Sequence, residues 1–198
     1  MSIGIQVSPP VPEFPSEPIL RFSVEQYHGM IQAGILTEEN VELLEGWLVN
    51  KRSKNPPHTL CTEALRDLLE KLTPEGWFVR CQEPITLGTS EPEPDLFIVQ
   101  GERDDYRDRH PGPEDVALVV EVSDTTLDRD RTTKKRIYAL AEISCYWIVN
   151  LQDLCAEVYT NPSRDEFEKM VRIGRDGALT VTIEKKTVGR VAVVDIFS

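Results

Sequence analysis

Two carboxylates stand at the ends of strongly β-forming segments. Glu121 interrupts the aliphatic run VALVVEV, where a carboxylate buried without a partner would be costly or would lose its charge. Asp95 follows the proline-rich turn EPEP and begins the run DLFIV. If the two runs are neighbouring strands, the carboxylates converge, and a divalent cation between them would relieve their repulsion. The simpler interpretations place Glu121 where its strand emerges into solvent and Asp95 in a turn.

A lysine downstream could complete such a site. Lys134 lies in RTTKKRIYALAE, and its spacing from Ile137 and Tyr138 puts it on the same helix face as these apolar residues. A lysine in the first turn of a helix opposes the helix dipole, so it needs a partner such as a carboxylate or a substrate phosphate. Lys135 remains an alternative, because spacing alone does not exclude it.

Hydrophobic periodicity predicts the elements that carry these residues. Residues 23–35 (SVEQYHGMIQAGI) form a capped amphipathic helix in this interpretation. Its apolar face consists of Val24, Tyr27, Ile31 and Ile35. Residues 41–50 predict strand structure around a turn at Gly46, and residues 54–72 predict a loop leading into a helix.

The remaining segments predict a sheet flanked by helices. Residues 77–87, 94–100 and 116–123 are β-type runs, and the last is aliphatic enough to be a central strand buried on both faces. A helix is expected over 130–142 and a strand over 145–150. Short β runs then follow at 155–160, 167–173, 179–184 and 191–196, with turns at Asn161-Pro162 and Asp176-Gly177. This order predicts an α/β fold with a mixed sheet and extra C-terminal strands.

Length and composition fit one globular domain. We expect residues 20–198 to form it, preceded by an extended proline-rich arm at 1–19 that carries no catalytic group. No apolar run approaches the roughly 20 residues that span a bilayer, and no secretory signal is evident, so we expect a soluble, cytoplasmic protein. The four cysteines form no CxxC pair, which favours reduced thiols over disulfides or a zinc knuckle.

Six sequence blocks together resemble a known family. They are KNPPH, GWFVRCQEPITL, EPEPD, LVVEVSDTTL, DRTTK and YWIVNL. The chain closely resembles, from about residue 21 to the C-terminus, the Uma-two family of bacterial proteins classed as endonucleases. The resemblance implies a restriction-endonuclease-like core of the PD-(D/E)xK type.

The resemblance also implies a role for each residue of the site. Asp95 and Glu121 would bind Mg²⁺, or Mn²⁺ in its place, and a lysine would position or activate the attacking water. The ordinary pattern puts that lysine two residues after the glutamate, where this chain has Ser123. The family resembles the variant in which the lysine lies in the following helix, within the DRxxK block. That block assigns the role to Lys134.

Four further residues are secondary candidates, each with a simpler alternative. His58 could orient a phosphate or water, or could be a local helix cap. Glu42 could supply an upstream acidic residue, or lie on the surface. Asp124 could act as an outer-sphere metal partner, or be a turn residue. Gln82 could line the same cleft, or form hydrogen bonds at the edge of the core.

These residues favour Mg²⁺-dependent hydrolysis of DNA, with a backbone carbonyl near Val122 as a further ligand. The alternative is a nuclease fold kept as a binding or regulatory module, which the formal charge of −12 and Ser123 would favour. A glycosidase pair is disfavoured because that chemistry asks for no lysine. A homodimer is expected by analogy alone. A basic rim could form from Arg103, Arg107, Arg109, His110, Arg129, Arg131, Lys134, Lys135 and Arg136.

Overall fold

The computed structural model describes residues 19–36, 41–51 and 53–197, so the predicted arm lies outside it except for its last residue. The helices are α1 (Val24–Gln32), α2 (Pro56–Glu70), α3 (Leu127–Arg129), α4 (Lys135–Leu140) and α5 (Val193–Ile196), and a π-helical turn, Asp130–Lys134, joins α3 to α4. The strands are β1 (Val41–Leu44), β2 (Trp47–Asn50), β3 (Trp77–Cys81), β4 (Leu96–Gln100), β5 (Val116–Ser123), β6 (Cys145–Asn150), β7 (Cys155–Ser163), β8 (Glu166–Ile173), β9 (Ala178–Ile183) and β10 (Lys186–Ala192). Two short 3₁₀ turns, Arg103–Tyr106 and Pro113–Asp115, lie between β4 and β5.

A six-stranded mixed sheet forms the centre of the fold, in the order β3-β4-β5-β6-β7-β8. Only β5 and β6 pair in parallel, because the segment from α3 to α4 crosses over between them. Every residue of β5 is buried, as the aliphatic run predicts. The predicted mixed α/β fold with extra C-terminal strands is therefore confirmed.

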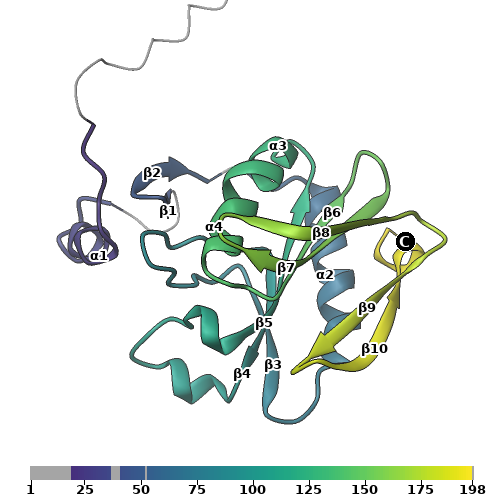
Figure 1. Ribbon diagram of the computed structural model, residues 1–198. Coiled ribbons are helices and arrows are strands. Elements are labelled where there is room, and N and C mark those ends of the chain that lie inside the picture. The colour runs from purple at the N-terminus through teal and green to yellow at the C-terminus, as the bar shows by residue number, and fades with distance from the viewer. Residues whose placement is uncertain (1–18, 37–40, 52, 198) are drawn as a thin grey trace, which may run out of the picture.

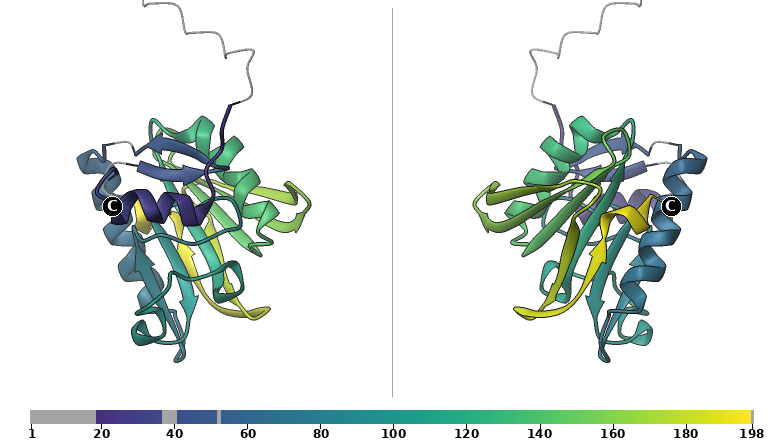
Figure 2. Two further views of the ribbon diagram at one scale, coloured as in Figure 1. Left: turned by 90° about the vertical axis from the view of Figure 1, so that its left-hand side faces the viewer. Right: turned by 90° about the vertical axis from the view of Figure 1, so that its right-hand side faces the viewer.

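Helices cover both faces of this sheet (Figures 1 and 2). On one face, Leu65 and Leu69 of α2 and the apolar side chains of the β9–β10 hairpin pack against alternate residues of β5 such as Leu118. On the other face, Ile137 and Tyr138 of α4 pack against Val119 and its neighbours. The sheet thus holds α2 and α4 on opposite sides of the ends of β4 and β5.

A third small cluster joins the N-terminal helix to the β1–β2 hairpin. Val24 and Tyr27 pack against Leu43, and Ser23 caps α1 by accepting a hydrogen bond from the Gln26 N–H at 3.2 Å. The predicted capped helix is therefore confirmed. It ends at Gln32, so Ile35 lies beyond it and is 70% exposed, and the prediction that Ile35 belongs to the apolar face is wrong.

Other predicted boundaries are also wrong, including that of the 77–87 run, because β3 ends at Cys81. The helix expected over 130–142 begins at Leu127, three residues earlier. Asn161-Pro162 does not separate two strands: both residues belong to β7, with Asn161 at a φ of 59°, and the chain turns after Ser163. The last β run is displaced from its expected position, because β10 runs from Lys186 to Ala192 and the next four residues coil into α5.

Within the described residues, no helix has the length and apolar character needed to cross a membrane.

β3 and β8 are the edge strands of the central sheet. The expected homodimer stays a prediction.

An ion pair ties the π-helical turn to β7. Arg131 Nε lies 3.1 and 3.2 Å from the two carboxylate oxygens of Glu157, and the Tyr159 hydroxyl donates to the same carboxylate at 2.6 Å. Burial would raise the pKa of Glu157, but the hydrogen bonds from Arg131 and Tyr159 outweigh it and hold that pKa below its usual value.

We expect Glu157→Gln to lower the free energy of unfolding at neutral pH by about 1–3 kcal/mol, because charged hydrogen bonds are lost. A folded-state pKa below the unfolded one stabilises the fold above the unfolded pKa, and this stabilisation disappears as the pH falls through the folded pKa. The difference between wild type and Glu157→Gln should therefore shrink in acid, measured by urea denaturation. Glu168→Gln, an exposed change on β8, is the control and should show no such difference. A pH-independent loss would contradict the ionic role of Glu157.

Candidate active site

The two predicted carboxylates lie on neighbouring antiparallel strands. Leu96 pairs with Val120, so the register places Asp95, just before β4, opposite Glu121 of β5. The Val122 N–H donates to Asp95 Oδ2 at 2.9 Å. Both carboxylates are buried, with Asp95 8% and Glu121 4% exposed. The alternative that Glu121 emerges into solvent is therefore wrong.

Glu121 has two donors on the helix that follows β5. Lys134 Nζ donates to Glu121 Oε1 at 2.9 Å, and the Tyr138 hydroxyl donates to the same oxygen at 2.8 Å. Lys134 also lies 3.3 Å from Glu42 Oε2. Burial would lower the pKa of Lys134, but Glu121 and Glu42 outweigh it and raise that pKa, so the lysine carries its charge.

The π-helical turn aims Lys134 at the sheet. Ser123 and Thr126 donate to Asp130 Oδ2 at 2.7 and 2.6 Å, and the Tyr146 hydroxyl donates to the Asp130 carbonyl at 3.1 Å. Ser123, which stands where the ordinary pattern has its lysine, thus fixes the turn that supplies Lys134 instead. The argument from the helix dipole is wrong, because helical structure begins at Leu127 and Lys134 does not lie in the first turn.

Lys135 lies away from this site. Its ammonium pairs with Glu166 Oε2 of β8 at 2.6 Å and sits 6.0 Å from the centroid of the Tyr159 ring. Of the two lysines that the spacing left open, the structure brings Lys134 to the carboxylates.

His58 contacts Asp95 from the first turn of α2. Its Nε2 lies 3.1 Å from Asp95 Oδ2. The alternative that His58 caps the helix is wrong, because Asn55 is the N-cap and accepts from the His58 N–H at 3.0 Å. Burial would raise the pKa of Asp95, but His58, the Val122 N–H and Lys134 outweigh it and lower that pKa, so Asp95 is ionised.

The other secondary candidates lie beside these residues. Glu42 of β1 is 2% exposed and forms an ion pair with Arg129 at 3.3 Å. The alternative that Glu42 lies on the surface is therefore wrong. Asp124, in a bend after β5, accepts from Asn55 Nδ2 at 2.6 Å. Gln82 does not belong to the strand before Asp95: it lies just beyond the end of β3, at a φ of 56°. Its backbone N–H donates a hydrogen bond to the Asp95 carbonyl.

All seven predicted residues line one cavity of about 80 Å³, together with Val122. That volume accommodates a hydrated ion or several waters. Sequence reasoning missed the lining residues Lys51, Lys54, Asn55, Glu93, Arg129 (considered only as part of a rim) and Asp130. Most of them lie in the blocks KNPPH, EPEPD and DRTTK, so the blocks held a signal that single-residue reasoning did not use.

The basic rim differs from the predicted one. Arg107, Arg109 and His110 line a separate pocket beside α1, and Arg103 lines another beside β3. Arg131 and Arg136 are held by Glu157 and Glu45. The cations that line the site are Lys51, Lys54, Arg129 and Lys134. Two of these four come from the loop before α2, which periodicity did not connect with the site.

The charges of the cavity fit a divalent cation. Six carboxylates face four cations, an excess of two negative charges. The crowding of carboxylates raises two pKa values. Burial and the nearby Asp130 and Asp95 raise the pKa of Glu121 to about 8, although Lys134 acts in the opposite direction. Burial also raises the pKa of Glu93. Asp130 Oδ1 is buried without a hydrogen-bond partner. Hard oxygen ligands of this kind suit Mg²⁺ or Mn²⁺.

Side chains alone do not complete a coordination shell here. Among the described residues, Asp95 and Glu121 belong to no group of three His, Cys, Asp or Glu side chains whose ligand atoms all lie within 4.8 Å of one another. Two carboxylates plus water is the arrangement that Mg²⁺ favours, since it gives up its waters reluctantly. Any metal held by Asp95 and Glu121 would therefore need water or backbone ligands as well.

Comparison with known proteins identifies the family. The model of the Uma-two family, described as "Putative restriction endonuclease", matches residues 24–182. The chain belongs to this family. It is also similar to a solved structure from Anabaena variabilis ATCC 29413, which is titled a "putative nuclease belonging to DUF820". The TM-score is 0.67 and the sequence identity is 14%, and the match covers 91% of this chain and 98% of that one. At this identity the likeness concerns the fold. No curated protein matches the chain.

We expect Lys134→Met to lower the free energy of unfolding by about 3–5 kcal/mol, because it leaves Glu121 buried without its cation and Glu42 with Arg129 alone. Lys135→Met is the matched control and should cost about 0–1 kcal/mol, as for a surface ion pair. Chemical denaturation without added metal measures both. Equal losses would mean that Lys134 is not the cation on which the carboxylates depend.

Proposed function

We propose that this member of the Uma-two family is a nuclease that hydrolyses phosphodiester bonds in DNA with the help of Mg²⁺. The observation that carries the proposal is the buried Glu121–Lys134 pair beside an ionised Asp95, in a cavity whose carboxylates outnumber its cations. Family membership supports the same reaction class.

Asp95 and Glu121 would hold the ion in this proposal. His58 and the Val122 N–H both bond Asp95 Oδ2 and so fix the orientation of that carboxylate. Val122 also lines the cavity, which keeps its carbonyl as the expected further ligand. When bound, a divalent ion polarises the scissile phosphate and lowers the pKa of a coordinated water.

Lys134 would act on the phosphate side of the reaction. It is charged and held by Glu121 and Glu42, so its ammonium is fixed in place before substrate arrives. A preorganised cation there can stabilise negative charge that develops on the phosphate and orient the attacking water. Tyr138 holds Glu121 from the same helix and keeps the pair aligned.

Local charge supports a polyanionic substrate in spite of the acidic chain. Four cations line the cavity, and a bound divalent ion would offset the two carboxylates by which its acidic residues outnumber them, whereas the formal charge of −12 belongs to the whole molecule. Lys54 is exposed at the cavity and is accessible to a phosphate backbone, whereas Lys51 is partly buried and pairs with Glu93. Non-specific contact over other surfaces is disfavoured by the net charge.

A cleavage assay tests the proposal. Purified protein is incubated with single- and double-stranded DNA and with RNA, in Mg²⁺, Mn²⁺ or EDTA. We expect metal-dependent cleavage of DNA, and we expect Asp95→Asn and Glu121→Gln to slow it by about 10²–10³-fold or more, the scale of losing one charge-stabilising group. Asp67→Asn, an exposed change on α2, is the control and should cleave like wild type.

Two results would overturn the proposal. Equal cleavage by wild type and both site variants would show that the activity arises elsewhere. Metal binding that is lost in the variants, with no cleavage of any nucleic acid by the wild type, would indicate the alternative, a nuclease fold kept as a binding or regulatory module.

The rim gives an independent prediction about affinity. We expect Lys54→Ala to weaken DNA binding and to reduce the slope of log affinity against log salt by about 1, because one phosphate contact is lost. Lys169→Ala on β8, away from the cavity, should leave both unchanged. Fluorescence anisotropy with labelled DNA in Ca²⁺ or EDTA at several salt concentrations measures both quantities. An unchanged slope for Lys54→Ala would place the nucleic acid elsewhere.

A further inference from the structure

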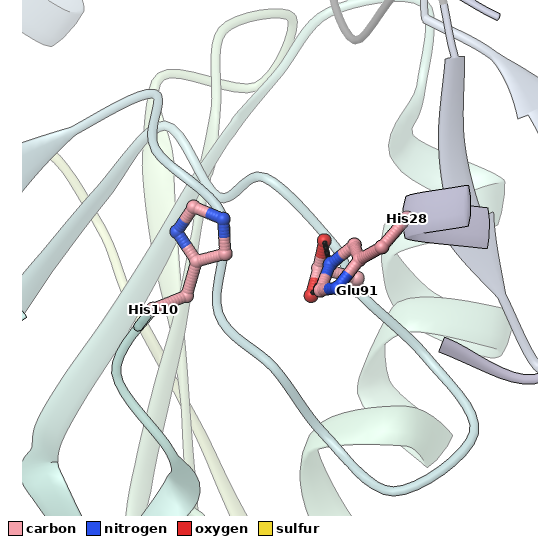
Figure 3. A group of neighbouring side chains, drawn as sticks. All are labelled: His28, Glu91 and His110. Atoms are coloured by element: carbon pink, nitrogen blue, oxygen red, sulfur yellow. Dashed lines mark hydrogen bonds and ion pairs between the residues drawn. The ribbon is translucent and has the colours of Figure 1, made fainter. Parts of the chain in front are cut away.

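A second group of metal-ligating side chains lies outside the cavity described above. The chain has three histidines, and two of them, His28 and His110, meet at Glu91. The ligand atoms of the three residues all lie within 4.8 Å of one another (Figure 3). His28 belongs to α1, Glu91 to the segment between β3 and β4, and His110 to the segment between β4 and β5. Residues distant in sequence therefore converge on one point.

The carboxylate of this group is firmly held. Its side chain is 2% exposed, and the Thr86 hydroxyl donates to Oε2 at 2.7 Å. His28 Nε2 lies 2.8 Å from Oε1 and 3.0 Å from Oε2. A ligating carboxylate that has its own hydrogen-bond donor is typical of built metal sites, since outer partners fix ligand orientation.

His110 supplies the third ligand from the opposite side. Its ring lies edge-on to that of His28, with centroids 6.2 Å apart and an angle of 60° between the ring planes, and Figure 3 shows Glu91 beside the His28 ring. In a tetrahedral zinc site, bonds of about 2.0–2.1 Å put ligand atoms roughly 3.4 Å apart. The ligand atoms of the three residues lie up to 4.8 Å apart, so the most distant of them must move closer by about 1–1.5 Å. Rotation of the partly exposed His110 side chain can supply this movement.

The ligand chemistry differs from that of the active site. Two imidazoles and one carboxylate are a borderline-soft donor set that suits Zn²⁺, whereas the cavity around Asp95 offers oxygen donors alone apart from His58. His28 and His110 also line a pocket of about 750 Å³ between α1 and the 106–114 segment. That pocket leaves room for a fourth ligand from solvent.

We propose that His28, Glu91 and His110 form a zinc site that fastens α1 to the body of the domain. The described apolar contacts of α1 run mainly through Val24 and Tyr27 to the β1–β2 hairpin. The metal would add a direct link from α1 to the two segments that flank β4. It would thereby connect the N-terminal helix to the segment that leads into Asp95.

Zinc binding to the purified full chain tests this site. Protein freed of metal with EDTA and dialysed is titrated with ZnCl₂ by calorimetry, and with Co²⁺ to record the visible bands of a tetrahedral site. We expect His28→Ala and His110→Ala each to weaken Zn²⁺ binding by at least roughly 10–100-fold. That is the usual cost of losing a residue that only supports a ligand, and these residues are ligands themselves. His58→Ala, which changes the remaining histidine, should retain this site.

Controls separate loss of a ligand from loss of the fold. His28→Ala also removes a hydrogen bond to buried Glu91, so its melting temperature without metal is compared with that of wild type. His110→Ala removes no side-chain hydrogen bond recorded among the described residues and should melt like metal-free wild type. Zinc should raise the melting temperature of wild type and of His58→Ala only.

Either of two results would overturn the proposal. Zn²⁺ affinity unchanged in His110→Ala would reduce the group to a His28–Glu91 hydrogen bond. Zn²⁺ binding lost in His58→Ala but kept in the other two variants would assign the metal to the cavity of Asp95.

Discussion

The ion pair between Lys134 and Glu121 is the interaction on which the rest of the site depends. A carboxylate inside the central strand is tolerated because a charged ammonium meets it at 2.9 Å. That ammonium must come from a helix packed on the sheet, since β5 itself offers Ser123 at the usual position of the lysine. The crossover from β5 to β6, its π-helical turn and the hydroxyls that bind Asp130 all serve to bring Lys134 to this point.

The same pair reconciles an acidic chain with a polyanionic substrate. The carboxylates of the cavity outnumber its cations, and the proposed divalent ion would complete the balance. The substrate would then meet the metal, Lys134 and the lysines of the loop before α2, while the surrounding negative surface discourages unspecific contacts. The net charge describes the whole molecular surface. The charge at one cavity can differ from it, so an acidic chain can still bind a polyanion there.

Two metal chemistries can coexist in one small domain because their ligand sets differ. Asp95 and Glu121 present oxygen atoms at the ends of two strands, a rigid position suited to a hard cation that keeps its waters. His28, Glu91 and His110 come from a helix and two connecting segments, and their nitrogen donors suit a softer cation. Glu91 and Asp95 lie in the same short segment, so the position of one bears on the other.

The sequence by itself determined the fold class and singled out the pair Asp95 and Glu121, because strand periodicity is local and an acidic residue in an aliphatic run stands out; its six blocks carried the resemblance to the family. It also supplied His58, Glu42, Asp124 and Gln82 as candidates. The family block favoured Lys134 but spacing left Lys135 open, and the tertiary structure decided between them, since a π-helical turn changes the direction of a side chain and has no periodic signature. Only the structure joined Lys51, Glu93 and Asp130 to the cavity and His28 to His110, because such contacts depend on how distant segments pack.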